Sequence, residues 1–217
     1  MRFAEFEEQV RQALAAPLPG PAAQQVLAPD PRRRWPAGRA RAARRDAAGL
    51  LLLYPGPDPH LVLTVRNGSL PQHGGQVSLP GGAVEPGETI GAAALREARE
   101  EIGLASDRVR LLGELTPLDI RVSNFRLHPV VGATAAPPHL APEEREVARI
   151  LTVPLAELRD PARFRRERRE LDGRAYLVPY FDIGGEQVWG ATAMILAEFL
   201  WITGWRPQPA PGESSPD

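Results

Sequence analysis

The stretch Gly82–Leu104, GAVEPGETIGAAALREAREEIGL, combines a glycine-rich turn with a helix whose second half is strongly charged. Positions three and four apart lie on the same face of a helix, so Glu97, Glu100 and Glu101 project together. At neutral pH three neighbouring carboxylates repel one another unless a positive charge lies between them. The sequence therefore predicts that these carboxylates meet either an arginine of the same segment or a divalent metal ion.

Residue spacing alone leaves both alternatives open. A solvated helix face with internal ion pairs is the usual arrangement in helices rich in Glu and Arg. Arg96 and Arg99 flank the three carboxylates, however, so we expect them to neutralise only part of the charge. A metal site is the other alternative, and carboxylate oxygens suit Mg²⁺ or Mn²⁺ better than a soft metal.

The composition excludes several classes of function. The chain has 217 residues, enough for one domain with a substantial core. Its net charge of −1 provides no overall field that would attract nucleic acid or an anionic membrane, and an aromatic content of 6% argues against a base-stacking surface. Cysteine is absent, which excludes disulfides, thiolate metal ligands and a cysteine nucleophile.

The N-terminal segment MRFAEFEEQV is acidic and has no apolar centre, so it does not have the pattern of a secretory signal. The apolar run at 47–54 is far too short to cross a bilayer. We therefore expect a cytoplasmic protein that binds neither nucleic acid nor membrane, and the sequence is compatible with a homodimer.

The sequence predicts three parts. Residues 1–45 form an amphipathic helix over 3–16, followed by an extended, loosely packed arm rich in Pro, Ala and Arg. Residues 46–205 form the folded domain, and residues 206–217 form a disordered tail.

Within the folded domain, apolar runs and alternating patterns predict strands over 47–54, 60–66, 76–79, 109–117, 124–132, 150–153, 164–171 and 174–181. Helices are predicted from about Glu88 or Thr89 to Gly103, over 155–159 and over 191–203, whereas 141–149 is either a short helix or a loop. Asp172-Gly173 predicts a tight hairpin turn. Because strands and helices alternate without a regular βαβ repeat, the predicted fold is α/β, with a mixed sheet in a three-layer α/β/α sandwich.

The opening stretch resembles the Nudix box, G-x5-E-x7-R-E-U-x-E-E-x-G-U, in which U is aliphatic. The residues in register are Gly82, Glu88, Arg96, Glu97, Glu100, Glu101, Gly103 and Leu104. Ala98 occupies the first aliphatic position, a small departure that affects packing and not chemistry. The resemblance implies the Nudix fold, hydrolase activity and a requirement for Mg²⁺ or Mn²⁺, and it favours the metal alternative.

The resemblance also implies roles for individual residues. Glu97 and Glu101, one turn apart, are the expected main metal ligands, and Glu100 is expected to join a second ion. A backbone carbonyl at Gly81 or Gly82 could complete the metal's ligand shell, because glycine lets the chain approach closely.

Two further roles are those of an ion pair that braces the loop and of the general base. Arg96 and Glu88 correspond to the family's internal pair, which ties the loop to the helix. The general base is left open between Glu100 and Glu146, the second being a candidate if its loop folds over the cleft.

The preceding segment, LTVRNGSLPQHGGQVSLPGG (63–82), resembles the segment that marks coenzyme A pyrophosphatases within the family. Matching positions include Arg66, Gly75 and Gln76, which we expect to bind substrate, since an anionic diphosphate is suited to an arginine fork. Asn67, Pro71 and Leu79 depart from that pattern, and the absence of an arginine at position 71 bears on coenzyme A specificity. Further matches downstream extend the similarity over about residues 45–203.

This second resemblance implies hydrolysis of the pyrophosphate of coenzyme A or its derivatives to 4′-phosphopantetheine and adenosine 3′,5′-bisphosphate. Such chemistry requires charge neutralisation and a positioned water more than covalent catalysis. The nearest alternative is a Nudix pyrophosphatase for ADP-ribose, NADH or a nucleoside triphosphate. A catalytically silent nucleotide-binding module is a third alternative, against which the intact glutamate set argues.

Overall fold

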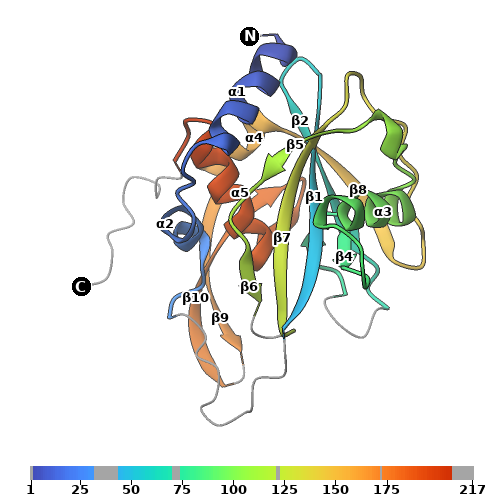
Figure 1. Cartoon of the computed structure of the whole chain (residues 1–217). Coiled ribbons are helices and arrows are strands. Elements are labelled where there is room, and N and C mark those ends of the chain that lie inside the picture. Colours follow the sequence, from blue (N-terminus) through green and yellow to red (C-terminus); the bar gives the residue numbers. More distant parts are fainter. Residues whose placement is uncertain (1, 32–43, 70–73, 121–122, 172, 207–217) are drawn as a thin grey trace.

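The computed structural model describes residues 2–31, 44–69, 74–120, 123–171 and 173–206. In chain order, the elements are α1 (Phe3–Ala15), α2 (Pro21–Gln24), η1 (Gln25–Leu27), β1 (Arg45–Tyr54), β2 (His60–Arg66), β3 (Val77–Ser78), β4 (Gly81–Ala83), α3 (Ile90–Ile102), η2 (Ser106–Arg108), β5 (Arg110–Glu114), β6 (Leu118–Ile120), β7 (Phe125–Ala133), β8 (Val147–Pro154), α4 (Leu155–Arg159), η3 (Pro161–Arg163), β9 (Phe164–Leu171), β10 (Arg174–Ile183), β11 (Glu186–Trp189) and α5 (Gly190–Ile202) (Figure 1).

The main sheet has eight strands, and β1 and β7 run through its centre (Figure 1). Its continuous path is β3-β2-β1-β7-β5, while β4 pairs with β1, β6 with β7 and β8 with β2. The β1–β7 pair is parallel and the other pairs are antiparallel. The predicted mixed sheet is therefore confirmed.

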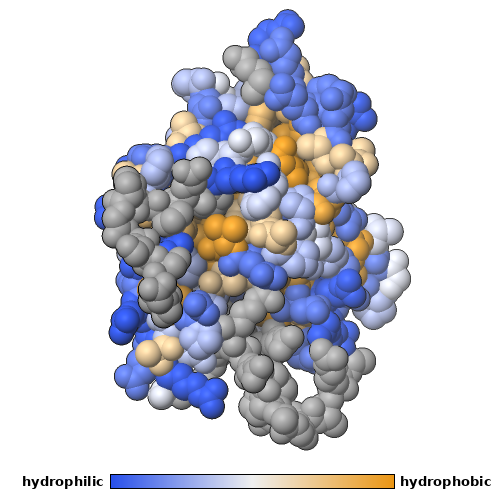
Figure 2. Space-filling model, turned by 90° about the vertical axis from the view of Figure 1, so that its left-hand side faces the viewer, coloured by the Kyte–Doolittle hydropathy of each residue, from blue (hydrophilic) through white to orange (hydrophobic). Residues whose placement is uncertain are grey.

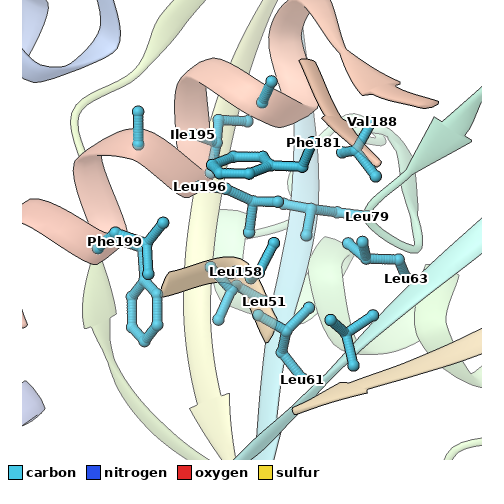
Figure 3. Close-up of a cluster of buried hydrophobic side chains, with 14 of the residues drawn as sticks. Leu51, Leu61, Leu63, Leu79, Leu158, Phe181, Val188, Ile195, Leu196 and Phe199 are labelled. Atoms are coloured by element: carbon cyan, nitrogen blue, oxygen red, sulfur yellow. The ribbon is translucent and has the colours of Figure 1, made fainter. Parts of the chain in front are cut away.

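Most of β1 is buried on both faces, because the sheet lies between two layers that each contain helices. Even-numbered residues of β1, such as Leu50 and Leu52, pack against α3, and odd-numbered residues, such as Leu51 and Leu53, face α5. The α5 side also receives α1 and a second, three-stranded sheet in the order β11-β10-β9. Figure 3 shows this larger core, where side chains of β1 and β2 meet Phe181 and the α5 residues Ile195, Leu196 and Phe199.

Several predicted elements match closely. The N-terminal helix, the second strand and the short helix at 155–159 are confirmed, and β9 and β10 form the predicted hairpin. Asp172, in the predicted turn of that hairpin, lies outside the described residues. The sequence did not reveal that the hairpin joins β11 in a sheet of its own. The segment 141–149 holds no helix, and β8 begins at Val147, earlier than predicted.

The expectation of a loosely packed arm is wrong for residues 17–31. These residues form α2 and η1, with Ala23 and Leu27 fully buried, and both elements pack against α5. Pro21 at the first helical position favours this turn rather than opposing it. Residues 32–43 and the tail beyond Arg206 lie outside the described residues.

The surface shown in Figure 2 is mainly hydrophilic, with hydrophobic residues in small separate patches. Among the described residues, Leu111 is the only large hydrophobic residue classed as exposed. Across the same ranges, no helix is both long and apolar enough to span a membrane.

Candidate active site

The site is built on α3, whose two ends are fixed by local sequence. The Thr89 hydroxyl accepts a hydrogen bond from the Ala92 amide at 3.2 Å, which caps the first turn. Gly103 ends the helix with φ +65°, a left-handed conformation suited to glycine. Both ends agree with the sequence prediction. Ala94 and Ala98 pack in the core between α3 and the sheet, and the carboxylates of Glu97 and Glu101 meet β4 at Gly82 and Gly81.

Glu97 lies directly against the glycine turn. A Cβ atom added to Gly82 would lie 2.5 Å from the Glu97 carboxyl carbon and from both of its oxygens. Only glycine therefore allows the backbone to approach this carboxylate so closely. Burial raises the pKa of Glu97, the Arg96 guanidinium lowers it, and the neighbouring carboxylates of Glu100 and Glu146 raise it again.

Glu101 is deeply buried, since only 2% of the residue is exposed. The reason is the close approach of β4 to β1, where a Cβ on Gly81 would lie 2.3 Å from the Ala48 carbonyl oxygen. This contact brings the Gly81 amide to within 3.0 Å of Glu101 Oε2, to which it donates a hydrogen bond.

Glu101 has little positive charge around it. Its other oxygen, Oε1, lies 3.5 Å from Arg66 Nη1. Burial raises the pKa of Glu101 to about 7, the Gly81 amide and Arg66 oppose this rise, and the carboxylates of Glu97 and Glu146 add to it. The buried carboxylate is therefore incompletely compensated by the groups around it.

Arg96 occupies the centre of the charged segment. Its Nε and Nη2 atoms donate to the two oxygens of Glu88 at 3.0 and 3.1 Å, and Nη2 also donates to the Ala83 carbonyl at 3.0 Å. Its Nη1 atom donates to Glu97 at 2.9 Å and to Glu100 at 3.2 Å. The hydrogen bond from Arg96 lowers the pKa of Glu88. One guanidinium thus ties the loop to the helix and contacts two of the three carboxylates of the face.

The segment that contains Glu146 folds against the C-terminal end of α3. The amides of Ala141 and Glu143 donate to the carbonyls of Ile102 at 3.0 Å and Glu101 at 2.8 Å, which satisfies carbonyls that a helix end leaves free. Glu146 itself is exposed. Its carboxylate raises the pKa of both Glu97 and Glu101, so it lies within electrostatic range of the helix carboxylates.

The three predicted substrate-binding residues are joined by backbone hydrogen bonds. The Gly75 amide donates to the Arg66 carbonyl at 3.0 Å, and the Arg66 amide donates to the Gln76 carbonyl at 2.9 Å. Gly75 has φ +75°, which a side chain would disfavour. Because Arg66 also lies 3.5 Å from Glu101, this group is physically connected to α3.

The carboxylate and backbone oxygens at this site are the types of ligand that a hard divalent cation prefers. Glu97 and Glu101 provide desolvated carboxylate oxygens, and the Gly82 backbone approaches Glu97 without an intervening side chain. In the part of the chain that the structure describes, no three Asp, Glu or His side chains are grouped so as to hold a metal ion. In this arrangement Arg96 contacts Glu97 and Glu100, whereas Glu101 is turned toward the Gly81 amide.

A model of the NUDIX domain matches residues 43–172, more than half of the chain. The chain belongs to the Nudix family. A Nudix hydrolase of Pectobacterium atrosepticum is 39% identical over 168 residues, which are 76% of this chain and 85% of that protein. A second, from Klebsiella pneumoniae, is 37% identical over 187 residues, 84% of this chain and 92% of the relative. Both are named "Uncharacterized Nudix hydrolase NudL".

Among solved structures, the RenU Nudix hydrolase of M. smegmatis has a TM-score of 0.44 and 26% identity, over 61% of this chain and 80% of that one. Family membership makes this chain a Nudix hydrolase with the Nudix fold, acting on a nucleotide-derived small molecule. Nudix hydrolases generally use divalent cations. The chain is therefore a hydrolase rather than a catalytically silent nucleotide-binding module.

One residue that sequence reasoning did not assign to the site is Asn67. In the sequence, Asn67 stands out only because it departs from the residue pattern of the segment that marks coenzyme A pyrophosphatases. In the structure, its side chain and backbone bind the segment that contains Glu146. The short-range pattern offers no signal for this contact, because the partners are 77 residues apart.

Proposed function

We propose that this Nudix hydrolase cleaves the pyrophosphate of coenzyme A and its derivatives. The observation that supports the proposal best is the contact between Arg66 and Glu101, with Nη1 and Oε1 3.5 Å apart. Arg66 belongs to the segment resembling coenzyme A pyrophosphatases, and Glu101 belongs to the Nudix helix. The residues that suggest the substrate therefore adjoin the carboxylates that suggest the chemistry.

Mg²⁺ or Mn²⁺ would be held mainly by Glu97 and Glu101, with Glu100 and the Gly82 carbonyl as further ligands. When bound, the cation neutralises charge on the diphosphate oxygens and lowers the pKa of coordinated water. The protein's own contribution is to hold the carboxylates in a buried setting. Arg96 and Glu88 keep the glycine turn against the helix, so that Gly82 stays close to Glu97.

The general base is proposed to be Glu146 rather than Glu100. Glu100 accepts a hydrogen bond from Arg96 at 3.2 Å, so one of its carboxylate oxygens is already engaged within the helix. Glu146 is exposed and forms no side-chain hydrogen bond or ion pair with another described residue, so its carboxylate can face a water molecule. Its electrostatic coupling to Glu97 and Glu101 indicates that it lies near the expected site of attack.

Arg66 is proposed to contact the diphosphate. Its guanidinium has five donors, and the contact with Glu101 uses one nitrogen, so the remaining nitrogens can bind a phosphate oxygen. Addition of one water across the phosphoanhydride gives 4′-phosphopantetheine and adenosine 3′,5′-bisphosphate, with release of a proton. Glu146 accepts the proton of the attacking water.

A substrate panel tests the proposal. Coenzyme A, an acyl-coenzyme A, ADP-ribose, NADH and nucleoside triphosphates are compared by kcat/KM with Mg²⁺ and with Mn²⁺, and products are separated as adenosine 3′,5′-bisphosphate or AMP. We expect the highest kcat/KM for coenzyme A or its thioester. Faster turnover of ADP-ribose, NADH or a nucleoside triphosphate would replace the substrate assignment and leave the Nudix chemistry intact.

A further inference from the structure

We propose that Asn67 is a positioning residue that holds the general base Glu146 at the catalytic helix. The inference rests on the proposed function, because it assumes the role given there to Glu146. Asn67 follows Arg66 directly at the end of β2, and it is half-buried. Asn67 lies outside the residue pattern of the Nudix helix.

The evidence is a set of four hydrogen bonds that use both ends of the Asn67 side chain and its backbone amide. The side-chain Nδ2 donates to the Glu144 carbonyl at 2.7 Å, and the backbone amide donates to the Glu146 carbonyl at 2.8 Å. The side-chain Oδ1 accepts from the Ser69 amide at 3.0 Å and from the Ser69 hydroxyl at 2.9 Å. With Oδ1 held by Ser69, Nδ2 is aimed at the loop that contains Glu146.

The loop is attached to the molecule on two sides. On one side, the amides of Ala141 and Glu143 bind carbonyls at the end of α3. On the other side, Asn67 binds the carbonyls of Glu144 and Glu146. The first side fixes where the loop starts, and the second fixes how far Glu146 lies from the carboxylates of α3.

Hydrogen bonds matter here because the loop has little packing of its own. Residues 141–146 are all exposed, and the first buried residue after them is Val147. The β2–β8 ladder is also irregular at this point: Val65 pairs with Arg149, whereas Arg66 pairs with Val147. An irregularity of this kind re-aims the chain and leaves the adjoining residue outside the regular ladder. Asn67 supplies contacts where the ladder ends.

The decisive variant is N67S. Serine can still accept from the Ser69 amide, and its backbone amide can still donate to the Glu146 carbonyl, but its side chain is too short to reach the Glu144 carbonyl. We expect kcat for the best substrate to fall roughly 10-fold with KM changed less than about two-fold, because misplaced catalytic groups slow the chemical step.

A double-mutant cycle with E146Q separates positioning from general structural damage. If Asn67 acts through Glu146, N67S should lower kcat by less than about two-fold in the E146Q background. An equal fold-loss in both backgrounds would overturn the inference, as would wild-type kcat in N67S. If E146Q alone keeps wild-type kcat, the assignment of Glu146 as base fails first, and the inference fails with it.

A readout independent of turnover is amide hydrogen exchange. N67S should speed exchange of the Glu146 and Val147 amides and leave the amides of α3 unchanged. The matched control is D160S, since Asp160 also binds a nearby amide, that of Ala162 at 2.9 Å, but caps a turn outside the Nudix helix. D160S should alter neither kcat nor exchange in 143–147. Unchanged exchange in N67S would contradict the positioning role.

Discussion

Two glutamates are buried on helices that cover opposite faces of the same sheet, and their surroundings differ. Glu198 of α5 is 0% exposed and accepts three hydrogen bonds, from the Gly20 amide at 3.0 Å, the Gln24 side chain at 2.9 Å and the Thr116 hydroxyl at 2.6 Å. Glu101 of α3 is 2% exposed and accepts one, from the Gly81 amide, with Arg66 at 3.5 Å.

The two carboxylates differ in how fully the protein satisfies their oxygens. Glu198 joins three segments that are far apart in the sequence, namely α2 with its N-cap Gly20, the β5–β6 connection and α5, and its oxygens are satisfied by the protein itself. Glu101 retains unused acceptor capacity in a buried setting, which is costly unless another partner is supplied. A satisfied buried carboxylate is structural, whereas an incompletely satisfied one is suited to binding a cation.

The largest expected effect is a difference in kcat/KM between variants of the two glutamates. E101Q should lower kcat/KM by roughly 10²–10³-fold, because a neutral amide cannot neutralise or hold a divalent cation as a carboxylate does. E198Q should keep kcat/KM within about three-fold of wild type, since Glu198 lies on α5, across the sheet from α3, and its oxygens already accept hydrogen bonds from the protein itself. Steady-state assays at saturating Mg²⁺ measure both. Wild-type turnover in E101Q would refute the metal role of Glu101.

A second prediction concerns pH dependence in the presence of a chelator. Burial raises the pKa of Glu101 to about 7 from an ordinary value of 4.5. Below pH 4.5 the group is protonated in both folded and unfolded protein, and as pH rises toward 7 only the unfolded protein ionises freely. The free energy of unfolding should therefore fall over this window by on the order of 3 kcal/mol more in wild type than in E101Q. Urea unfolding at several pH values measures the difference, and parallel curves would contradict it.

A third prediction concerns stability, where the larger effect is expected at Glu198 and not at Glu101. E198Q should lower the free energy of unfolding by about 1–3 kcal/mol, because the new amide hydrogens face donors in a buried site. E101Q should not lower it at pH 7.5 with a chelator present, since the substitution removes a poorly compensated buried charge. Urea titration monitored by circular dichroism provides the comparison. Equal losses in both variants would mean that Glu101 is also chiefly structural.

The smallest predicted effect isolates one hydrogen bond of the Glu198 cluster. T116V removes the hydroxyl donor at nearly constant volume and leaves Glu198 with its other two donors. We expect a loss of about 1 kcal/mol in the free energy of unfolding, with kcat/KM unchanged. A loss as large as that of E198Q would indicate that the three donors do not act separately.

Part of this site could be predicted from local sequence. The spacing of Glu97 and Glu101 fixes them one turn apart, and Thr89 and Gly103 define the helix between them, because capping and helical periodicity depend only on near neighbours. The depth of Glu101 could not be predicted, since it depends on how closely β4 approaches β1 through Gly81. A charged residue at Glu198 within an otherwise apolar helix was a signal of buried polar contacts, but its partners lie as many as 178 residues away.

The sequence by itself determined the Nudix helix, the strands that flank it, the mixed sheet and the resemblance that points to coenzyme A. These features follow from periodicity, caps and motif register, which are properties of short segments. Only the tertiary structure decided which carboxylates are buried, that Glu101 meets Arg66 rather than Arg96, and that Asn67 hydrogen-bonds the loop that contains Glu146. Those facts depend on contacts between segments distant in the chain, which are set by the packing of the whole sheet.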